Sequence, residues 1–236
     1  MSFTKNIYSN KVFLFTYSAL MTSVVFLTTI VISIYIPATQ GFFNIGEFGV
    51  YIAALTGGPI VGLIAGGLGS ALADIFLGYT HYAPITLLVK GVEGALVGYI
   101  AYRFREINIS RGIGISITAL TGLSLAMIGS IFYVGEAELS IFGMISTISI
   151  SSLIWIAIAL GLVILGLYLI RRNPSRTGDI IAMLIGGSEM ITGYFIAQYI
   201  LFGAAAYVEL FYNFMQVIIG MTLALITYTY LEKIQL

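Results

Sequence analysis

The stretch GGPIVGLIAGGLGSALAD, residues 57–74, decides the fold of this 236-residue chain. Glycine favours leaving a helix and proline favours starting one, so residues 56–59, Thr-Gly-Gly-Pro, predict a tight turn between two helices. Small residues then recur every four positions and form a ridge that another helix backbone can approach closely. They are Gly58, Gly62, Gly66 and Ser70. The stretch closes on Asp74, an acid in an otherwise apolar helix.

Outside this stretch the chain consists mainly of long apolar runs. A helix needs about 20 mainly apolar residues to span the hydrocarbon, because lipid offers no partner for a free backbone amide. The runs that meet this requirement are residues 12–36, 59–78, 84–102, 113–134, 141–170, 179–201 and 207–231. The first is too long for the apolar core of a signal peptide, so we expect it to be a retained helix.

Residues 42–57 are a shorter and ambiguous candidate for a membrane span. The distribution of basic residues decides whether they cross the membrane. Lys and Arg accumulate in short cytoplasmic loops. If residues 42–57 cross, nine of the ten basic residues fall on one side of the membrane; if not, residues 103–111 fall opposite Lys5 and Lys11. We therefore predict an all-α protein of the cell (cytoplasmic) membrane, with about eight crossings and both termini in the cytoplasm.

Composition excludes several classes of function. Hydrophobic residues make up 59% of the chain and charged residues 8%, against roughly 25% charged in a soluble domain. Basic and acidic residues balance, so nothing indicates a nucleic-acid partner. With no cysteine and one histidine, His81, we expect no metal and no cofactor. The chain also lacks a phosphate-cradling loop of the Walker type, so other chains must hydrolyse any ATP that drives it.

Four ionisable residues lie inside the predicted spans: Asp74, Lys90, Glu93 and Glu189. Each costs at least a few kcal/mol at the bilayer centre, so each should face the bundle interior and have a partner. Asp74 and Lys90 lie on successive helices joined by a turn at residues 79–83, which the predicted topology places outside. Each lies about eight residues from the middle of that turn, roughly 12 Å of helix, so the two can pair. Such a pair either fixes helix register or contacts a ligand.

The other two acids enlarge this group. Glu93 follows Lys90 by three residues on nearly the same helix face, and Glu189 lies about 15 Å into its own helix, again near mid-depth. Three acids against one base leave an excess of negative charge. Either a carboxylate binds a proton, or a ligand brings a positive or strongly donating group.

Polar and aromatic residues suited to a small organic molecule surround the charged group. They are Asn44, Tyr51, Tyr79, His81, Tyr82, Thr86, Tyr194, Gln198, Asn213 and Gln216. Tyrosines also anchor helices at the membrane interface, which is an equally good interpretation of Tyr79 and Tyr82. The predicted topology places Glu47, His81, Glu136, Glu138 and Glu209 at or near the outer face.

The first helix carries a second small-residue face, formed by Ser18, Ala19, Thr22 and Ser23. Such a face lets a helix from another protein approach.

These motifs together resemble the substrate-binding S components of energy-coupling factor (ECF) vitamin transporters. The resemblance rests on residues 44–47 (NIGE), 57–74, 83–87 (APITL) and 90–94 (KGVEG), followed by 193–195 (GYF) and 213–216 (NFMQ). It covers roughly residues 12–105 and 179–231 and is closest to the riboflavin-type group, whose members do not all bind riboflavin.

The resemblance implies a six-helix bundle that captures a vitamin or vitamin precursor from outside. Such subunits dock on a transmembrane coupling subunit and two ATPase subunits, and Ala19 and Ser23 lie where the family carries its docking motif. This chain departs from the family between residues 112 and 170, which we interpret as an inserted two-helix hairpin within a single transmembrane domain, residues 1–236. The resemblance therefore predicts an ATP-driven importer's binding subunit and no enzyme.

An ion-coupled secondary transporter or channel that uses the Asp/Lys/Glu group is the alternative. That class favours inverted repeats, and the motif around Asp74 has no later counterpart in the sequence. The expected substrate-binding residues are Asn44, Glu47, Asp74, Tyr79, Tyr82, Thr86, Lys90, Glu93, Glu189, Tyr194, Asn213 and Gln216, and the expected docking residues are Ser18, Ala19, Thr22 and Ser23.

Overall fold

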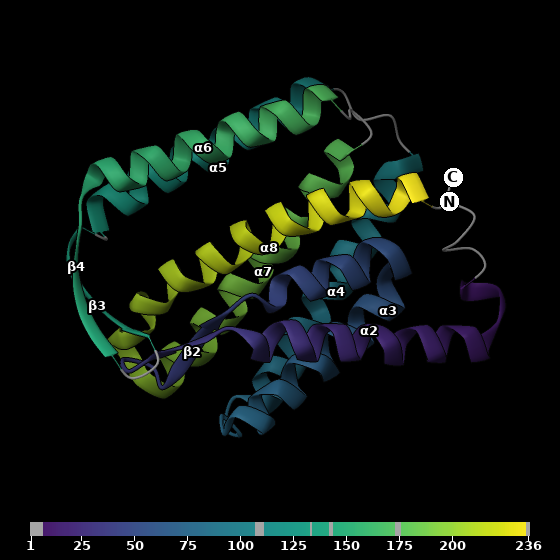
Figure 1. Cartoon of the computed structure of the whole chain (residues 1–236), viewed down its shortest axis with the longest axis horizontal. Coiled ribbons are helices and arrows are strands. Elements are labelled where there is room, and N and C mark those ends of the chain that lie inside the picture. The colour runs from purple at the N-terminus through teal and green to yellow at the C-terminus, as the bar shows by residue number, and fades with distance from the viewer. Residues whose placement is uncertain (1–6, 107–110, 133, 142–143, 173–175, 235–236) are drawn as a thin grey trace. The chain divides into compact units, whose positions relative to one another are not determined.

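A computed structural model describes residues 7–106, 111–132, 134–141, 144–172 and 176–234. The chain divides into two compact units, each treated by itself below. Unit 1 comprises Met1–Arg103 and Ala182–Leu236, and unit 2 comprises Phe104–Ile181. The elements are labelled in Figure 1.

Unit 1 begins with helix α2, Lys11–Val31, which is capped by the Asn10 side chain accepting from the Val12 and Phe13 amides. The helix was predicted to continue to residue 36, and this was wrong. Residues Ser33–Ile36 form strand β1, which pairs antiparallel with strand β2, Gly41–Asn44. β-branched and aromatic residues favour a strand here, and Pro37 disfavours helical geometry in the residue before it.

Helix α3, Gly46–Leu77, contains the turn that the sequence predicted. Gly58 leaves helical geometry at φ 79° and ψ −169°, a region open essentially only to glycine. A methyl group added at Gly62 would lie 3.1 Å from Ala54 Cβ, and one added at Gly66 would lie 3.3 Å from Val50 Cγ1. These pairs are symmetric about Gly58, so the two halves of α3 fold back antiparallel to each other. The predicted short helix starts four residues later than expected because residues 41–44 belong to β2.

The second half of α3 packs against helix α4, Ala83–Glu106, along the predicted glycine ridge. A side chain at Gly62 would overlap the Gly94 backbone, and one at Gly66 would lie 2.5 Å from the Lys90 carbonyl oxygen. The small residues thus allow backbone-to-backbone contact, as such ridges do in membranes. This approach brings Lys90 into the middle of unit 1.

Two further helices complete unit 1. Helix α7, Thr177–Phe202, is followed by a short 3₁₀ turn, Gly203–Ala205, and by helix α8, Ala206–Ile234. Their positions agree with the predicted spans 179–201 and 207–231. Close glycine contacts join α7 to α4 and α8 to α3, at Gly186 beside Val97 and at Gly220 beside Glu47.

Unit 2 contains an antiparallel helix pair. Helices α5, Arg111–Phe132, and α6, Ser152–Arg172, lie side by side (Figure 1) and contact each other where Gly129 faces Trp155. Strands β3, Gly135–Ile141, and β4, Met144–Ile150, join them. The prediction of one helix over residues 141–170 was therefore wrong at its start, since Met144–Ile150 consists largely of β-branched isoleucine and threonine with two serines, a composition that favours a strand.

The helices have the length and composition of membrane spans. The stretches that qualify among the described residues are Lys11–Val31, Gly46–Leu77, Ala83–Arg105, Gly112–Ile131 and Thr177–Leu231, with Ser152–Tyr168 as a shorter apolar helix. The second of these stretches is broken at Gly58, and the last contains α7 and α8. The chain is an all-α membrane protein in its spans, with short β-hairpins between them.

Candidate functional site

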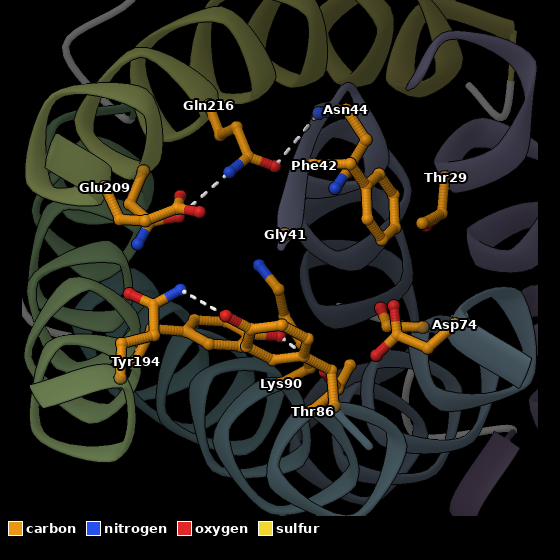
Figure 2. Close-up of a pocket in the computed structure, with 14 residues that line it drawn as sticks. Thr29, Gly41, Phe42, Asn44, Asp74, Thr86, Lys90, Tyr194, Glu209 and Gln216 are labelled. Atoms are coloured by element: carbon orange, nitrogen blue, oxygen red, sulfur yellow. Dashed lines mark hydrogen bonds between the residues drawn. The ribbon is translucent and has the colours of Figure 1, made fainter. Parts of the chain in front are cut away.

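A polar pocket opens inside unit 1 and encloses about 460 Å³ of space not filled by atoms, part of which is open to solvent. Its wall comes from α2, β2, α3, α4 and the turn before α4, together with α7 and α8 (Figure 2). The lining residues are Thr29, Gly41, Phe42, Asn44, Ser70, Asp74, Tyr82, Thr86, Lys90, Tyr194, Gln198, Glu209, Asn213 and Gln216. Elements distant in sequence therefore meet at one cavity.

The β1–β2 hairpin forms one end of the pocket. Buried Thr39, in the turn between the strands, hydrogen-bonds to the Glu209 carboxylate of α8. The Tyr82 hydroxyl donates to the Thr39 carbonyl at 2.7 Å and accepts from Gln198 Nε2 at 3.4 Å. A side chain at Gly41 would lie 2.7 Å from the Glu209 carboxylate, so a larger residue there would displace the Glu209 side chain.

Burial raises the pKa of Tyr82, which lies in the turn before α4, from its usual 10.0 to about 12. The phenol therefore remains neutral at physiological pH and keeps its proton for the Thr39 carbonyl. Tyr79, in the same turn, also has a pKa raised by burial. It lies behind the wall, with its ring stacked on the Phe42 ring at 4.5 Å between centroids. Tyr79 thus supports Phe42 instead of lining the pocket.

A second group of hydrogen bonds links β2 to α8. The Asn44 backbone amide donates to Gln216 Oε1 at 3.3 Å, and Gln216 Nε2 donates to Asn213 Oδ1 at 3.0 Å. Asn213 and Gln216 are both buried. Their three-residue spacing on α8 places both side chains on the face that meets β2.

A third group crosses the pocket from α7 to α3. The Tyr194 hydroxyl donates to Thr86 Oγ1 at 2.9 Å, and Thr86 is the hydrogen-bond partner of the Asp74 carboxyl group. Asp74 and Thr86 are 3% and 2% exposed, so neither is a surface group.

Lys90 lies at the centre of the charged group, and its amine points toward the middle of the pocket in Figure 2. The amine pairs with Glu47 and, at 3.2 Å, with Glu93. Tyr51 donates a hydrogen bond to Glu93 at 3.1 Å. Lys90 therefore pairs with Glu47 and Glu93 in place of the Asp74 partner considered from the sequence. Glu47, which the sequence predicted at or near the outer face, is fully buried in the first turn of α3.

The structure brings most of the predicted substrate-binding residues into this one region. Those in the wall are Asn44, Asp74, Tyr82, Thr86, Lys90, Tyr194, Asn213 and Gln216. Glu47 and Glu93 lie behind Lys90 as its ion-pair partners. Glu189 is half-buried and does not line the pocket.

Sequence reasoning missed several lining residues. Gly41 was not considered, Phe42 was placed in a candidate helix, and Glu209 was predicted at or near the outer face without a role in the pocket; it is 2% exposed in the pocket wall. Thr29 and Ser70 were not considered as lining residues. The proline after Ile36 was the available signal for a hairpin, and a hairpin there would have turned residues 41–44 back over the bundle.

The small-residue set on α2 does not share one exposed face. Ser18 is buried, and the Thr22 carbonyl lies 2.8 Å from where a side chain on Gly69 would be. Ala19 and Ser23 are exposed. Ser18 and Thr22 therefore face the rest of unit 1, whereas Ala19 and Ser23 remain on the exposed side of α2.

The chain matches the family "ECF-type riboflavin transporter, S component" over residues 9–170, and it belongs to that family. A protein of Pyrococcus woesei described as "Uncharacterized protein in gap 3'region" is 49% identical over 72 residues, which are 30% of this chain and 48% of that protein. The chain thus spans about half the length of this relative.

The chain is therefore a multi-pass membrane protein of the ECF-type S-component family. The matched range includes residues 112–170 and stops before α7, whereas the pocket also uses α7 and α8.

Proposed function

We propose that this chain captures a vitamin or vitamin precursor from outside the cell in the pocket of unit 1, for ATP-driven import by its partner subunits. The observation that carries the proposal is the wall itself. Buried polar side chains from α2, β2, α3, α4, α7 and α8 converge on one cavity inside an otherwise apolar bundle. Buried polar groups in lipid are costly, so their concentration at one cavity favours ligand binding over packing.

The distribution of basic residues supports a pocket that faces the outside. The pocket lies beside the β1–β2 hairpin and the turn before α4, which the distribution of basic residues assigns to the outer side. The same distribution places both termini in the cytoplasm and the protein in the cell membrane. The substrate then enters beside the hairpin.

Within the pocket we assign direct substrate contact to the predicted residues that line it. Glu47 and Glu93 act through Lys90 by holding its amine, and Tyr79 acts through Phe42. Glu189 does not line the pocket, but it interacts electrostatically with Glu93 and Lys90, so we assign it no direct substrate contact.

Partner docking is assigned to the exposed part of the α2 small-residue face, Ala19 and Ser23. A coupling subunit's helix can approach closely there, since neither side chain is large. Residues 112–170 contribute α5, α6 and the β3–β4 hairpin between them, and their separate contact unit favours an insert within the transmembrane domain. Two ATPase subunits complete the proposed importer.

The buried Lys90, Glu47 and Glu93 group keeps one alternative open, an ion-coupled transporter or channel. The two functions differ in what the chain does alone. A capture subunit binds its vitamin in detergent with no ion gradient, whereas a coupled transporter moves substrate across liposomes in response to sodium or protons.

Native mass spectrometry of the full chain against a vitamin panel tests the proposal. We expect one compound to bind at one copy per chain, and Thr86→Val to weaken that binding, since the substitution removes the hydroxyl between Tyr194 and Asp74. Ser188→Ala is the matched control, because Ser188 is exposed and its hydroxyl only bonds to Leu184 of its own helix. No one-to-one binding by any compound would refute the proposal.

A further inference from the structure

The pocket wall contains three buried polar atoms that have no hydrogen-bond partner among the residues that the structure describes. They are Asp74 Oδ2, Gln198 Oε1 and Asn213 Nδ2. Each side chain is at most 4% exposed. A buried polar atom without a partner is destabilising by about 1–3 kcal/mol, so three of them around one cavity indicate groups that a ligand satisfies.

The hydrogen bonds around Asn213 fix what that side chain offers. The Asn44 backbone N–H can only donate, so Gln216 must present its oxygen there and its nitrogen to Asn213. Asn213 then accepts through Oδ1, and its amide nitrogen is the atom that remains. Asn213 therefore offers a donor, and the ligand must supply an acceptor.

The same reasoning fixes Gln198. The Tyr82 hydroxyl uses its single proton on the Thr39 carbonyl, so it can only accept from Gln198. Gln198 must turn its nitrogen toward Tyr82, and its oxygen remains. Gln198 therefore offers an acceptor, and the ligand must supply a donor.

Asp74 offers a second acceptor. The Tyr194 hydroxyl donates to Thr86, which leaves the Thr86 proton for one carboxyl oxygen of Asp74. The other oxygen has no partner in the described part of the chain. Figure 2 shows Asp74 on the wall across the pocket from Glu209.

The carboxylates around the pocket disfavour an anionic ligand. Asp74 and Glu209 line the cavity, and Glu47 and Glu93 lie behind its one lining base, Lys90. The Lys90 amine already forms ion pairs with the carboxylates of Glu47 and Glu93. A phosphate or carboxylate on the ligand would have to compete with them at low dielectric, where like charges repel strongly.

We infer that the ligand is an uncharged or cationic ring compound that presents two hydrogen-bond donors, to Asp74 and Gln198, and one acceptor, to Asn213. This inference rests on the proposed function and specifies the chemistry of its substrate. Phe42 supplies aromatic surface for the ring, and its own ring is held by stacking on Tyr79.

Matched pairs of compounds that differ in one anionic group test this inference. The full chain in lipid nanodiscs is titrated with 4-amino-5-hydroxymethyl-2-methylpyrimidine, pyridoxine, riboflavin and nicotinamide, and with their anionic counterparts, the phosphate esters and nicotinate. Thiamine, biotin and pantothenate complete the panel. We expect the tightest ligand to be uncharged or cationic and to bind at least tenfold more tightly than its anionic counterpart, where one exists.

Two substitutions then probe the assigned atoms. Asp74→Asn replaces an acceptor by a donor, and Asn213→Asp does the reverse; each should weaken binding of the tightest ligand about tenfold. Ser188→Ala and Thr229→Ala are controls on α7 and α8, because both hydroxyls bond only within their own helices.

The outcomes separate the inference from the proposed function. Tightest one-to-one binding by biotin, pantothenate, nicotinate or a phosphate ester would overturn the inference and leave vitamin capture intact. Unchanged affinity in both substituted proteins, with the controls also unchanged, would overturn the assignment of the three atoms. No one-to-one binding of any compound would overturn the proposed function and this inference with it.

Discussion

Replacement of Lys90 by methionine is the perturbation whose effect the structure defines best. Lys90 is 6% exposed, and its amine pairs with two buried carboxylates, Glu47 and Glu93. Methionine keeps most of the length and apolar surface of the side chain, so packing against the glycine ridge is largely preserved. The substitution therefore removes chiefly the positive charge.

The expected loss of stability follows from the two partners. Removing one member of a buried ion pair is destabilising by about 3–5 kcal/mol, because an uncompensated charge remains. Here two carboxylates lose their cation, and Tyr51 remains as a hydrogen-bond donor to only one of them. For a chain of this length 1 kcal/mol corresponds to about 2–4 °C in Tm, so we expect Lys90→Met to lower Tm by about 10 °C.

Thermal unfolding of the full chain in one detergent measures this effect. Lys11→Met is the control, since Lys11 is an exposed residue at the start of α2. The triple variant with Glu47→Gln and Glu93→Gln should recover much of the lost stability, because no unpaired charge then remains. A Tm for Lys90→Met within about 2 °C of the Lys11→Met value would refute the buried ion-pair assignment.

Three further predictions concern packing, pH and docking. Gly62→Ala should destabilise unit 1 by about 2 kcal/mol in thermal unfolding, because the methyl group overlaps the Gly94 backbone. Gly161→Ala, where nothing lies within 4 Å of the added carbon, should be neutral or stabilising. The pKa of Tyr82 is raised from 10.0 to about 12, so the folded state keeps a proton that the unfolded chain loses, and stability should fall between those pH values by about 1.4 kcal/mol per unit. Tyr82→Phe should make that alkaline loss shallower; an unchanged slope would contradict the assignment. Leucine at both Ala19 and Ser23 should prevent co-purification with a coupling subunit while vitamin binding is retained; intact assembly would place docking elsewhere.

The helical framework was predictable because its signals are local. Residues 56–59 predicted the turn in α3, and the contacts of Gly62 and Gly66 show that the two halves of the helix fold back on each other there. The runs 179–201 and 207–231 became α7 and α8 with small changes at their ends. Lipid forces every backbone amide to bond internally, so apolar length alone nearly determines a span.

The strands were not predictable by the same reasoning. Residues 33–36 and 144–150 are apolar enough to extend a neighbouring run, and hydropathy does not distinguish a strand at the membrane surface from the end of a helix. β-Branched residues and Pro37 were the available signals, but over stretches too short to outweigh a 20-residue window.

Part of the pocket wall and the Lys90–Glu93 pair were predictable, but the pairing of Lys90 with Glu47 was not. Intramembrane charge pointed to Asp74, Lys90 and Glu93, and the structure places all three around one cavity or directly behind it. Matching depth suggested Asp74 as the partner of Lys90, but depth does not determine which helix face meets which. Glu47 became the partner because the fold-back of α3 carries it to Lys90, a contact between distant residues that no spacing rule anticipates.

Equilibrium binding to the full chain in lipid nanodiscs, with no ATP, no partner subunit and no ion gradient, is the decisive measurement for ligand binding in the polar pocket of unit 1. We expect saturable binding of one uncharged or cationic compound per chain, weakened about tenfold by Asp74→Asn and unaffected by Ser188→Ala. Absence of such binding, together with sodium- or proton-driven uptake into liposomes that contain only this chain, would contradict this expectation.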